Sequence, residues 1–383
     1  MTMATLADIV RIFGDSYQQE FGAGLLPSHQ KALRDIAQCH TEALGGHLYW
    51  CGDCGREHYR YHSCRNRACP ACQSDAREDW IDARLEDLLP CRYFHLVFTL
   101  PEELNRLIRS NQKALLKALM QSAGRSLLKL ALDPKHLGGD IGVLAVLHTW
   151  GSTLEYHPHV HCLVPGGALV KDLGVWQAGG DSFFLPVRAL SRVFRGMFLE
   201  ALSEVVPASE IPQGLREKEW VVFCKAVVQG PEKVIEYLGR YIHRTAISNG
   251  RIRSVENGSV TFEYKDYRDK RKKLMTLTGH EFLRRMLQHV LPSGFHRVRY
   301  FGLFTPANKA RFRSLQTALW NLSGRMFPEK RPARGKGVVC PFCQSPRVGL
   351  LGILPSATRC GYRGGGEPVG DFPLAACAPP GMP

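Results

Sequence analysis

A short segment of alternating histidines constrains this chain more than any other feature. His157, His159 and His161 occupy every second position, and an apolar run over residues 162–164 follows them directly. Successive side chains of a β-strand point to opposite faces, so the three imidazoles are expected on one face of a strand. Imidazoles gathered in this way can bind a divalent cation. The segment therefore predicts a metal-binding strand, with a surface strand of chance histidines as the plain alternative.

A second informative segment begins at Pro231, which suits the first turn of a helix because an N–H has no partner there. Apolar residues follow at helical spacing, at positions 234, 235, 238 and 242. Tyr237 and Tyr241 are four residues apart, so both are expected on one side of the helix. Tyrosines in such a pattern commonly pack at the edge of a core. Beside a metal-binding strand they also suit attack on a phosphodiester that a metal ion polarises.

Further motifs occur in a fixed order between about residue 25 and about residue 345. In order, they are Cys64-Arg65-Asn66-Arg67, Cys69-Pro70-x-Cys72, Phe98-Thr99-Leu100-Pro101, Leu147-His148-Thr149-Trp150-Gly151, the histidine segment, Tyr237-Leu238-Gly239-Arg240-Tyr241, Ala246-Ile247-Ser248-Asn249 and Leu291-Pro292-x-Gly294-Phe295-His296-Arg297. With this set in this order the chain resembles the HUH-type rolling-circle transposases of insertion sequences. Within them it resembles the two-tyrosine class with an N-terminal zinc-binding region. The order of the motifs is more specific than any one of them.

The expected fold is α+β, because strand-like segments are interleaved with helical ones without strict parallel alternation. The resemblance refines this to an antiparallel-sheet HUH endonuclease core flanked by helices, with a small N-terminal zinc-binding module. Strands are expected over residues 94–100, 143–150, 160–164, 220–228 and 260–264, and helices within 5–44, 75–89, 102–132, 188–203, 231–244 and 281–291. The expected domains are a helical and zinc-binding DNA-recognition module (1–90), a catalytic domain with the tyrosine helix (91–260), a basic extension (261–335) and a Cys-x-x-Cys segment with a disordered tail (336–383).

The resemblance assigns roles to the histidines and the tyrosines. His159 and His161 become ligands of a catalytic Mg or Mn ion, with either His157 or His148 as the third ligand. Tyr237 and Tyr241 become the nucleophiles that form a 5′-phosphotyrosine link and release a 3′-OH, so that strands rejoin without ATP. Residues expected to contact the DNA or to assist the tyrosines are Arg65, Arg67, Arg77, Arg240, His243 and Arg244, with Lys225 and Lys265 as further phosphate contacts.

Two Cys-x-x-Cys pairs predict a structural zinc site. Cys51 and Cys54 precede Cys69 and Cys72 by a gap of fourteen residues, close to the spacing of four-cysteine zinc sites. Further ligands for a second zinc ion are available at Cys39, His47, His58, His62 and Cys64. One departure concerns Ala68, where the resembled family carries a histidine, so that His62 or His40 would have to substitute or the second site is weakened. A third pair, Cys340 and Cys343, has no evident partner pair and is at most a partial zinc knuckle.

Charge and composition indicate the partner. The net charge is +15 with a pI near 9.3, and the basic excess concentrates over residues 265–273 and 305–336. Beside a phosphodiester-cleaving site, such a surplus predicts a track for a polyanion, here single-stranded DNA at transposon ends and target DNA. Thirteen cysteines without a signal peptide favour metal sites over disulfides. No apolar run long enough for a membrane span occurs, so a cytoplasmic, nucleoid-associated protein is expected.

Two other functions remain open from the sequence. A plasmid or phage replication initiator, or a relaxase, would use the same chemistry, although the zinc region and the order of the motifs favour a transposase. A non-catalytic, zinc-dependent DNA-binding regulator could retain the same fold without activity.

Overall fold

The structure is a computed structural model that describes residues 4–84, 87–170, 174–180, 184–227, 239, 242, 244–324 and 337–356. The chain divides into two units. The first contains residues 1–39 and 63–336, and the second contains residues 40–62 and 337–383. This division differs from the expected one, in which residues 1–90 formed one module and residues 336–383 a separate end. The reason is a strand pairing between residues far apart in the chain, described below with the second unit.

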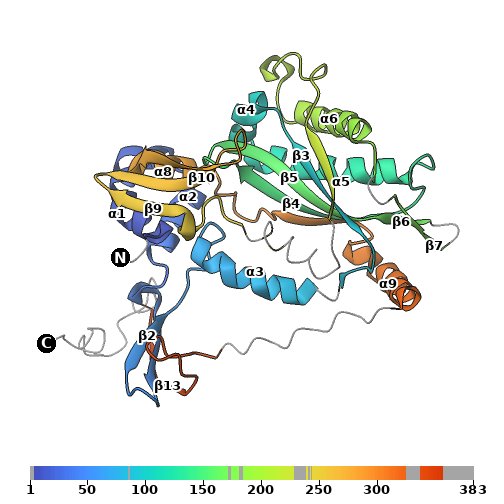
Figure 1. The fold of residues 1–383 in the computed structure, drawn as a ribbon. Coiled ribbons are helices and arrows are strands. Elements are labelled where there is room, and N and C mark those ends of the chain that lie inside the picture. Colours follow the sequence, from blue (N-terminus) through green and yellow to red (C-terminus); the bar gives the residue numbers. More distant parts are fainter. Residues whose placement is uncertain are drawn as a thin grey trace, which may run out of the picture. The chain divides into compact units, whose positions relative to one another are not determined.

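A five-stranded sheet is the centre of the first unit (Figure 1). Its strands are β3 (Tyr93–Thr99), β4 (Gly142–Trp150), β5 (Tyr156–Pro165), β8 (Val222–Val227) and β12 (Val298–Gly302). They follow the order β12-β4-β5-β3-β8, and every neighbouring pair is antiparallel. The predicted α+β fold with an antiparallel sheet is confirmed, and β4 forms an antiparallel hairpin with β5. Strand β12 was not predicted.

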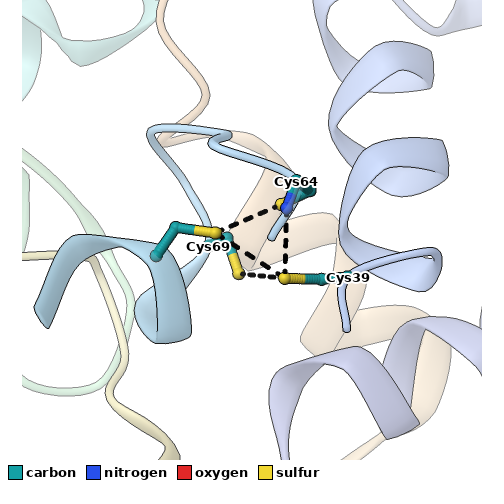
Figure 2. Close-up of side chains that lie close together, drawn as sticks. Cys39, Cys64 and Cys69 are labelled. Atoms are coloured by element: carbon teal, nitrogen blue, oxygen red, sulfur yellow. Dashed lines mark hydrogen bonds between the residues drawn. The ribbon is translucent and has the colours of Figure 1, made fainter. Parts of the chain in front are cut away.

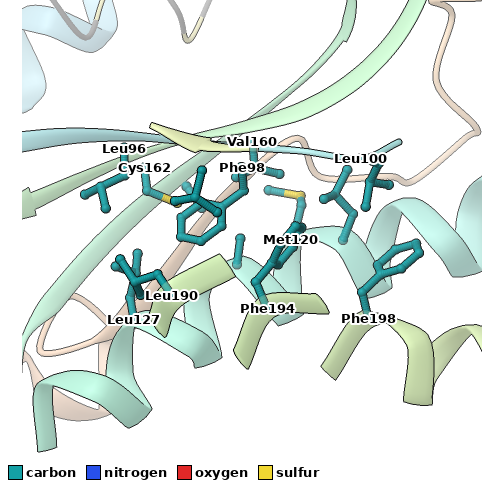
Figure 3. Packing of buried hydrophobic residues seen from close by; sticks show 14 of the residues in the cluster. Leu96, Phe98, Leu100, Met120, Leu127, Val160, Cys162, Leu190, Phe194 and Phe198 are labelled. Carbon is teal, nitrogen blue, oxygen red and sulfur yellow. The ribbon is translucent and has the colours of Figure 1, made fainter. Parts of the chain in front are cut away.

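Helices cover one face of this sheet and bury its apolar side chains. These helices are α4 (Asn105–Ser110), α5 (Gln112–Leu132) and α6 (Val187–Ser203), all within segments predicted to be helical. Figure 3 shows Met120 of α5 and Phe194 of α6 packed against Phe98 and Val160 of the sheet. Burial of an apolar side chain of this size contributes about 1.5–3 kcal/mol relative to its exposure, so this layer holds the sheet in place.

The same packing determines which way the histidines point. Along β5, Tyr156, Val160 and Cys162 belong to the core beneath the sheet, while the alternate positions are only partly buried. The strand therefore presents residues 157, 159 and 161 on the face opposite α5 and α6, as the alternation predicted. A register slip of one residue would turn the imidazoles into this core and expose its apolar set.

A second part of the first unit surrounds a three-stranded sheet of order β11-β10-β9. Its strands are β9 (Ile252–Glu256), β10 (Ser259–Lys265) and β11 (Lys272–Thr278), and the helices that share its core are α1 (Leu6–Phe21), α2 (Pro27–Ala37) and α8 (Gly279–Leu287). Helix α3 (Pro70–Arg84), helix α9 (Lys309–Ser323) and the hairpin of β6 (Gly167–Val170) with β7 (Val175–Ala178) also belong to the first unit. Short 3₁₀ turns lie at Gly22–Gly24, Glu42–Leu44, Glu102–Leu104, Ala208–Glu210, Asn249–Arg251 and Pro306–Asn308.

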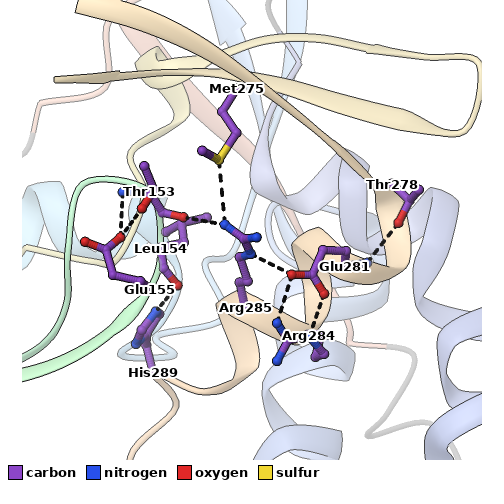
Figure 4. Close-up of polar contacts among 9 residues, drawn as sticks. All are labelled: Thr153, Leu154, Glu155, Met275, Thr278, Glu281, Arg284, Arg285 and His289. Carbon is purple, nitrogen blue, oxygen red and sulfur yellow. Dashed lines mark hydrogen bonds and ion pairs between the residues drawn. The ribbon is translucent and has the colours of Figure 1, made fainter. Parts of the chain in front are cut away.

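Polar contacts of helix α8 attach it to the loop between β4 and β5 (Figure 4). Glu281 pairs with Arg284 at 2.5 Å and with Arg285 at 2.6 Å. The contact with Arg284, and then that with Arg285, lowers the pKa of the Glu281 carboxyl to about 2. Arg285 also donates to the Thr153 carbonyl at 3.1 Å. Just beyond the helix, an imidazole nitrogen of His289 lies 3.2 Å from the Leu154 carbonyl. The loop that joins the two histidine-bearing strands is thus held from outside the sheet.

The second unit is a small sheet closed by the C-terminal part of the chain. Its strands are β1 (Gly46–Cys51), β2 (Glu57–Tyr61) and β13 (Val348–Leu354), in the order β13-β1-β2 with both pairs antiparallel. Strand β13 was not predicted within residues 336–383, where only a Cys-x-x-Cys segment and a disordered tail were expected, and its backbone pairs with β1 up to Leu354. Residues 357–383 lie outside the part of the chain that the structure describes.

Burial of His289 makes a pH dependence of stability testable. Burial lowers the pKa of this imidazole, which is 8% exposed, to about 4, whereas an unfolded chain has a value near 6.5. Below pH 6.5 the unfolded state therefore binds a proton that the folded state does not, and stability falls as pH falls towards 4. Between pH 7.5 and 5, we expect wild type to lose about 2 kcal/mol more than a His289→Gln variant, measured by denaturant unfolding. Parallel pH profiles of the two proteins would contradict this role.

Candidate metal and DNA-cleavage site

Three histidines of the β4–β5 hairpin converge on the open face of the sheet. One imidazole nitrogen each of His148, His159 and His161 lies within 4.8 Å of the others. The register explains this, since His148 is the direct cross-strand partner of His159 and His161 follows two residues further along β5. Of the two candidates for the third ligand, the structure brings His148 into the group. His157 shares the face, with its ring 5.2 Å from that of His159, but does not belong to the cluster.

Hydrogen bonds orient two of these imidazoles. The Nδ1 atom of His159 lies 2.7 Å from the carbonyl oxygen of His157, so Nδ1 carries the proton and Nε2 keeps its lone pair. The Nδ1 atom of His161 lies 2.8 Å from Nε2 of His95 on β3, and the two rings are stacked. Metal-binding histidines typically have the second nitrogen held in this way. Sequence reasoning missed His95, because it stands alone in an apolar strand and only the sheet register brings it beside His161.

The protonation of the cluster suits a metal ion. Burial lowers the pKa of His159 to about 4 and that of His161 well below its ordinary value, and nearby charge, including that of Arg244, lowers both further. Both rings are therefore neutral near pH 7 and offer lone pairs rather than positive charge. Three converging imidazoles, of which His159 and His161 are neutral, thus fit a divalent cation of the kind that the resemblance implies.

Arg297 connects the histidine strands to the segment that follows the candidate tyrosines. Its guanidinium donates to the carbonyl oxygens of Ile242 and Arg244, the latter at 3.0 Å. Its own carbonyl accepts from the N–H of Leu147 at 2.8 Å, one residue before His148. Burial lowers the pKa of Arg297 to about 10, which leaves it charged at neutral pH. From the sequence, Arg297 was noted only as the last residue of a motif, and its contacts with Ile242 and Arg244 were not predicted.

The side chain of Ile242 packs on the histidine-bearing face of the sheet. Its side chain is 2% exposed and belongs to a core cluster that includes Val146 and Leu163, which lie on that same face of β4 and β5. The predicted nucleophiles Tyr237 and Tyr241, and the predicted DNA contacts Arg240 and His243, lie outside the residues that the structure describes. Arg244 is described and exposed.

The N-terminal arginines differ in their contacts. Arg65 is exposed and has a left-handed backbone conformation, with φ of 54°. Arg67 donates to the carbonyl oxygens of Phe295 and Pro292, the latter at 3.3 Å, and therefore ties its loop to another part of the first unit. Arg67 is exposed as well, so contact with DNA stays a prediction for both arginines. The side chain of Arg77 lies outside the described part of the chain.

The cysteines group differently from the predicted four-cysteine site. Cys69 and Cys72, at the start of α3, cluster with Cys39 and Cys64 in the first unit (Figure 2). Their Sγ atoms are 3.5 to 3.6 Å apart in the Cys39–Cys72, Cys64–Cys72 and Cys39–Cys69 pairs. Cys51 and Cys54 lie instead in the second unit, with Cys340 and Cys343. The single site of residues 51, 54, 69 and 72 was wrong, because equal spacing does not specify which pairs meet in space.

The departure at Ala68 has no consequence for this cluster. Four cysteines complete it, so no histidine is required at position 68 or as a substitute at His40 or His62. The loop is organised by Asn66, whose side chain accepts from the N–H of Ala68 at 2.9 Å and donates to Asp35 at 2.9 Å. His47 and His62, proposed as further ligands, contact each other edge to face in the second unit and join no metal-ligand cluster among the described residues.

Comparison with known proteins identifies the family. Residues 9–100 match a family model described as a transposase zinc-binding domain, and residues 142–311 match one described as a putative transposase. The putative transposase y4qJ of Sinorhizobium fredii is 44% identical over 316 residues, which cover 78% of this chain and 79% of that protein. The transposase for insertion sequence element IS801 of Pseudomonas savastanoi pv. phaseolicola is 32% identical over 302 residues, 73% of this chain and 71% of that protein.

The chain belongs to the HUH-type transposases of insertion sequences. The transposase zinc-binding region and the cysteine clusters support structural zinc in this transposase. Among solved structures, the metal-free conjugative relaxase TrwC in complex with oriT DNA aligns with 61% of this chain and 73% of its own at 13% identity, with a TM-score of 0.23. A TM-score this low carries no argument about fold or function. No helix within the described residues is long and apolar enough to cross a membrane.

The geometry of the histidine cluster distinguishes His148 from His157 as metal ligand. We expect His148→Ala to weaken Mn²⁺ binding about tenfold or more, because it removes one of three converging nitrogens. The matched variant His157→Ala should bind Mn²⁺ with nearly wild-type affinity. Isothermal titration calorimetry with the metal alone measures both. Equal losses in the two variants would show that the ligand set is wrong.

Proposed function

We propose that this transposase nicks single-stranded DNA at the ends of its insertion sequence through a 5′-phosphotyrosine intermediate, and then rejoins the strands. The observation that carries the proposal is the placement of Ile242, next in sequence to Tyr241, in a cluster on the sheet face that also presents the three-histidine group. A nucleophile and a cation site on one face are what phosphodiester transfer requires. The proposed setting is the cytoplasm, on nucleoid DNA.

The proposed ion is Mg or Mn, held by His148, His159 and His161. Imidazole ligands suit Mn better than Mg, which prefers oxygen, so water and phosphate oxygens would complete the coordination. When bound, the ion supplies Lewis-acid polarisation of the scissile phosphate. His95 holds His161 by the 2.8 Å contact between their rings, and the carbonyl of His157 holds His159.

The chain's own residues supply the nucleophile and positive charge. In the proposed step the hydroxyl oxygen of Tyr241 or Tyr237 forms a bond to phosphorus, the bond from phosphorus to the 3′-oxygen breaks, and that oxygen takes a proton to become the 3′-OH. Resealing is the reverse attack by a 3′-OH, which conserves the phosphodiester and needs no ATP. Arg244, close enough to the histidines to influence their pKa, would offset the charge of the reacting phosphate.

Two exposed regions suit contact with the DNA backbone. Lys225 is exposed on the edge strand β8 and pairs in register with His95, so its side chain leaves the sheet on the histidine face. The turn between β10 and β11 exposes Arg268, Lys270 and Arg271 around Tyr267, which is 73% exposed. Basic side chains beside an exposed aromatic ring are typical of single-strand contacts, in which the ring stacks on a base.

The comparisons support a transposase over a replication initiator or a relaxase. A regulator that kept the fold without cleavage remains the alternative of another class. The test is whether purified protein cuts a labelled single strand carrying an insertion-sequence end in the presence of Mn²⁺.

Variants of the tyrosine pair test the intermediate. We expect wild type to form a covalent DNA–protein adduct on Tyr237 or Tyr241, with Tyr241 favoured because Arg240, His243 and Arg244 surround it in the sequence. Each single Phe variant should keep part of the activity, and Tyr237→Phe/Tyr241→Phe should form no adduct. Denaturing gels and peptide mapping of the adduct measure this. An adduct in the double variant would refute the assignment, and full transposition by Tyr237→Phe would make Tyr237 a packing residue.

Arg297 provides a test of positioning that is separate from chemistry. Arg297→Lys keeps a positive charge but cannot reach the Ile242 and Arg244 carbonyls with one planar fork. We expect cleavage to slow about 100-fold, because a small misplacement of reacting groups has an effect of this size. The Mn²⁺ affinity and the melting temperature should change little. Arg299→Lys, two residues along β12 with its guanidinium over the Phe295 ring, is the matched control and should cleave normally. Wild-type cleavage by Arg297→Lys would remove this role.

A further inference from the structure

Two Cys-x-x-Cys turns from opposite ends of the sequence meet in the second unit. The Sγ atoms of Cys51 and Cys343 are 3.6 Å apart, as are those of Cys54 and Cys340, and all four lie within 4.8 Å of one another. A tetrahedral zinc ion with Zn–S bonds of about 2.3 Å separates its sulfur ligands by about 3.8 Å. A disulfide requires about 2.05 Å, and all four cysteines are free. The spacing is therefore that of one metal site rather than of two covalent bridges.

The two turns have the same backbone pattern. In the first, the N–H of Cys51 donates to the carbonyl of Arg56 at 3.0 Å, and the N–H of Gly55 donates to that of Cys51 at 2.9 Å. In the second, the N–H of Cys340 donates to the carbonyl of Ser345 at 2.9 Å, and the N–H of Gln344 donates to that of Cys340 at 2.9 Å.

The residue after each Cys-x-x-Cys also has the same left-handed backbone, with φ of 69° at Gly55 and 59° at Gln344. Gln344 adopts this conformation without being a glycine, which L-residues do only where the surroundings favour it. Two turns of identical geometry that present two sulfurs each are suited to share one ion.

Polar contacts join the two turns around the sulfurs. The carboxylate of Asp53 accepts from the Ser345 hydroxyl and pairs with Arg347. The N–H of Gly52 donates to the Arg347 carbonyl at 2.8 Å, and the Arg56 guanidinium lies 5.0 Å from the centre of the Phe342 ring. These contacts hold the turns facing each other, and the positive side chains lie near a site that would carry a net charge of −2 with four thiolates and zinc.

We propose that Cys51, Cys54, Cys340 and Cys343 bind one structural zinc ion, which joins the C-terminal segment to the N-terminal hairpin. The family match to a zinc-binding domain ends at residue 100 and the transposase match ends at residue 311, so neither includes the second pair. The described part of the unit spans only residues 40–62 and 337–356, a size at which a chain seldom folds on its apolar core alone. Cys51 and Cys340 are completely buried, so the metal takes the place of that core.

Metal content of the full chain tests the proposal. Wild type purified without added metal should contain two zinc ions per chain by elemental analysis. Cys340→Ser/Cys343→Ser should contain one, and so should Cys64→Ser/Cys69→Ser, which removes half of the other cluster. The control Cys224→Ser, a cysteine outside both clusters, should retain two. The site would be overturned if the Cys340→Ser/Cys343→Ser variant contained two zinc ions. It would also be overturned if wild type and this variant each contained one.

Two measurements keep the test decisive if the serine variant does not fold. Cys343→His replaces one exposed thiolate by another zinc ligand, so this variant should fold and retain two ions. Cobalt-substituted wild type should show the absorption of tetrahedral thiolate sites, and Cys343→His should change part of that spectrum. An unchanged cobalt spectrum, or a disulfide between these cysteines in mass spectrometry of non-reduced protein, would refute the proposal.

Discussion

The pairing of β4 with β5 is the constraint on which the candidate site depends. Its register puts His148 opposite His159, and the alternation of β5 buries Tyr156 and Val160 on one side while His159 and His161 occupy the other. The core against α5 and α6 therefore fixes the direction of the imidazoles without touching them. Because the apolar set and the histidine set alternate, burial of the apolar set also fixes which face presents the candidate cation site.

Elsewhere in the first unit, four cysteines lie within or against the apolar core that surrounds the three-stranded sheet. Cys39, Cys64, Cys69 and Cys72 draw together the end of α2 and the start of α3 across a loop that contains Asn66. Zinc binding at such a cluster contributes folding free energy directly, because the unfolded chain has no preformed site. The five-stranded sheet presents the candidate cation site, and this cysteine cluster connects α2 with α3.

Local patterns in the sequence predicted the fold and half of the site, and contacts between distant residues account for the rest. The alternation at His159 and His161 is a property of one strand, so it was readable without a structure. His148 was one of two alternatives, because the sequence does not specify the register of a hairpin with a bulge near Trp150. His95 and Arg297 gave no periodic signal, since their roles come from single contacts across the sheet. The cysteine pairs were recognised as ligands but grouped wrongly, because three Cys-x-x-Cys pairs and two single cysteines can combine in several ways.

Arg297 connects the strand that carries His148 to the residues that directly follow the proposed nucleophile Tyr241. Its carbonyl is bonded to Leu147 beside His148, and its side chain binds the backbone that directly follows the tyrosine segment. Arg297 therefore links β4 to Ile242 and Arg244 by hydrogen bonds, in addition to the packing of Ile242 in a cluster with Val146. The contacts are to backbone carbonyls, so they position the segment whatever side chains it carries.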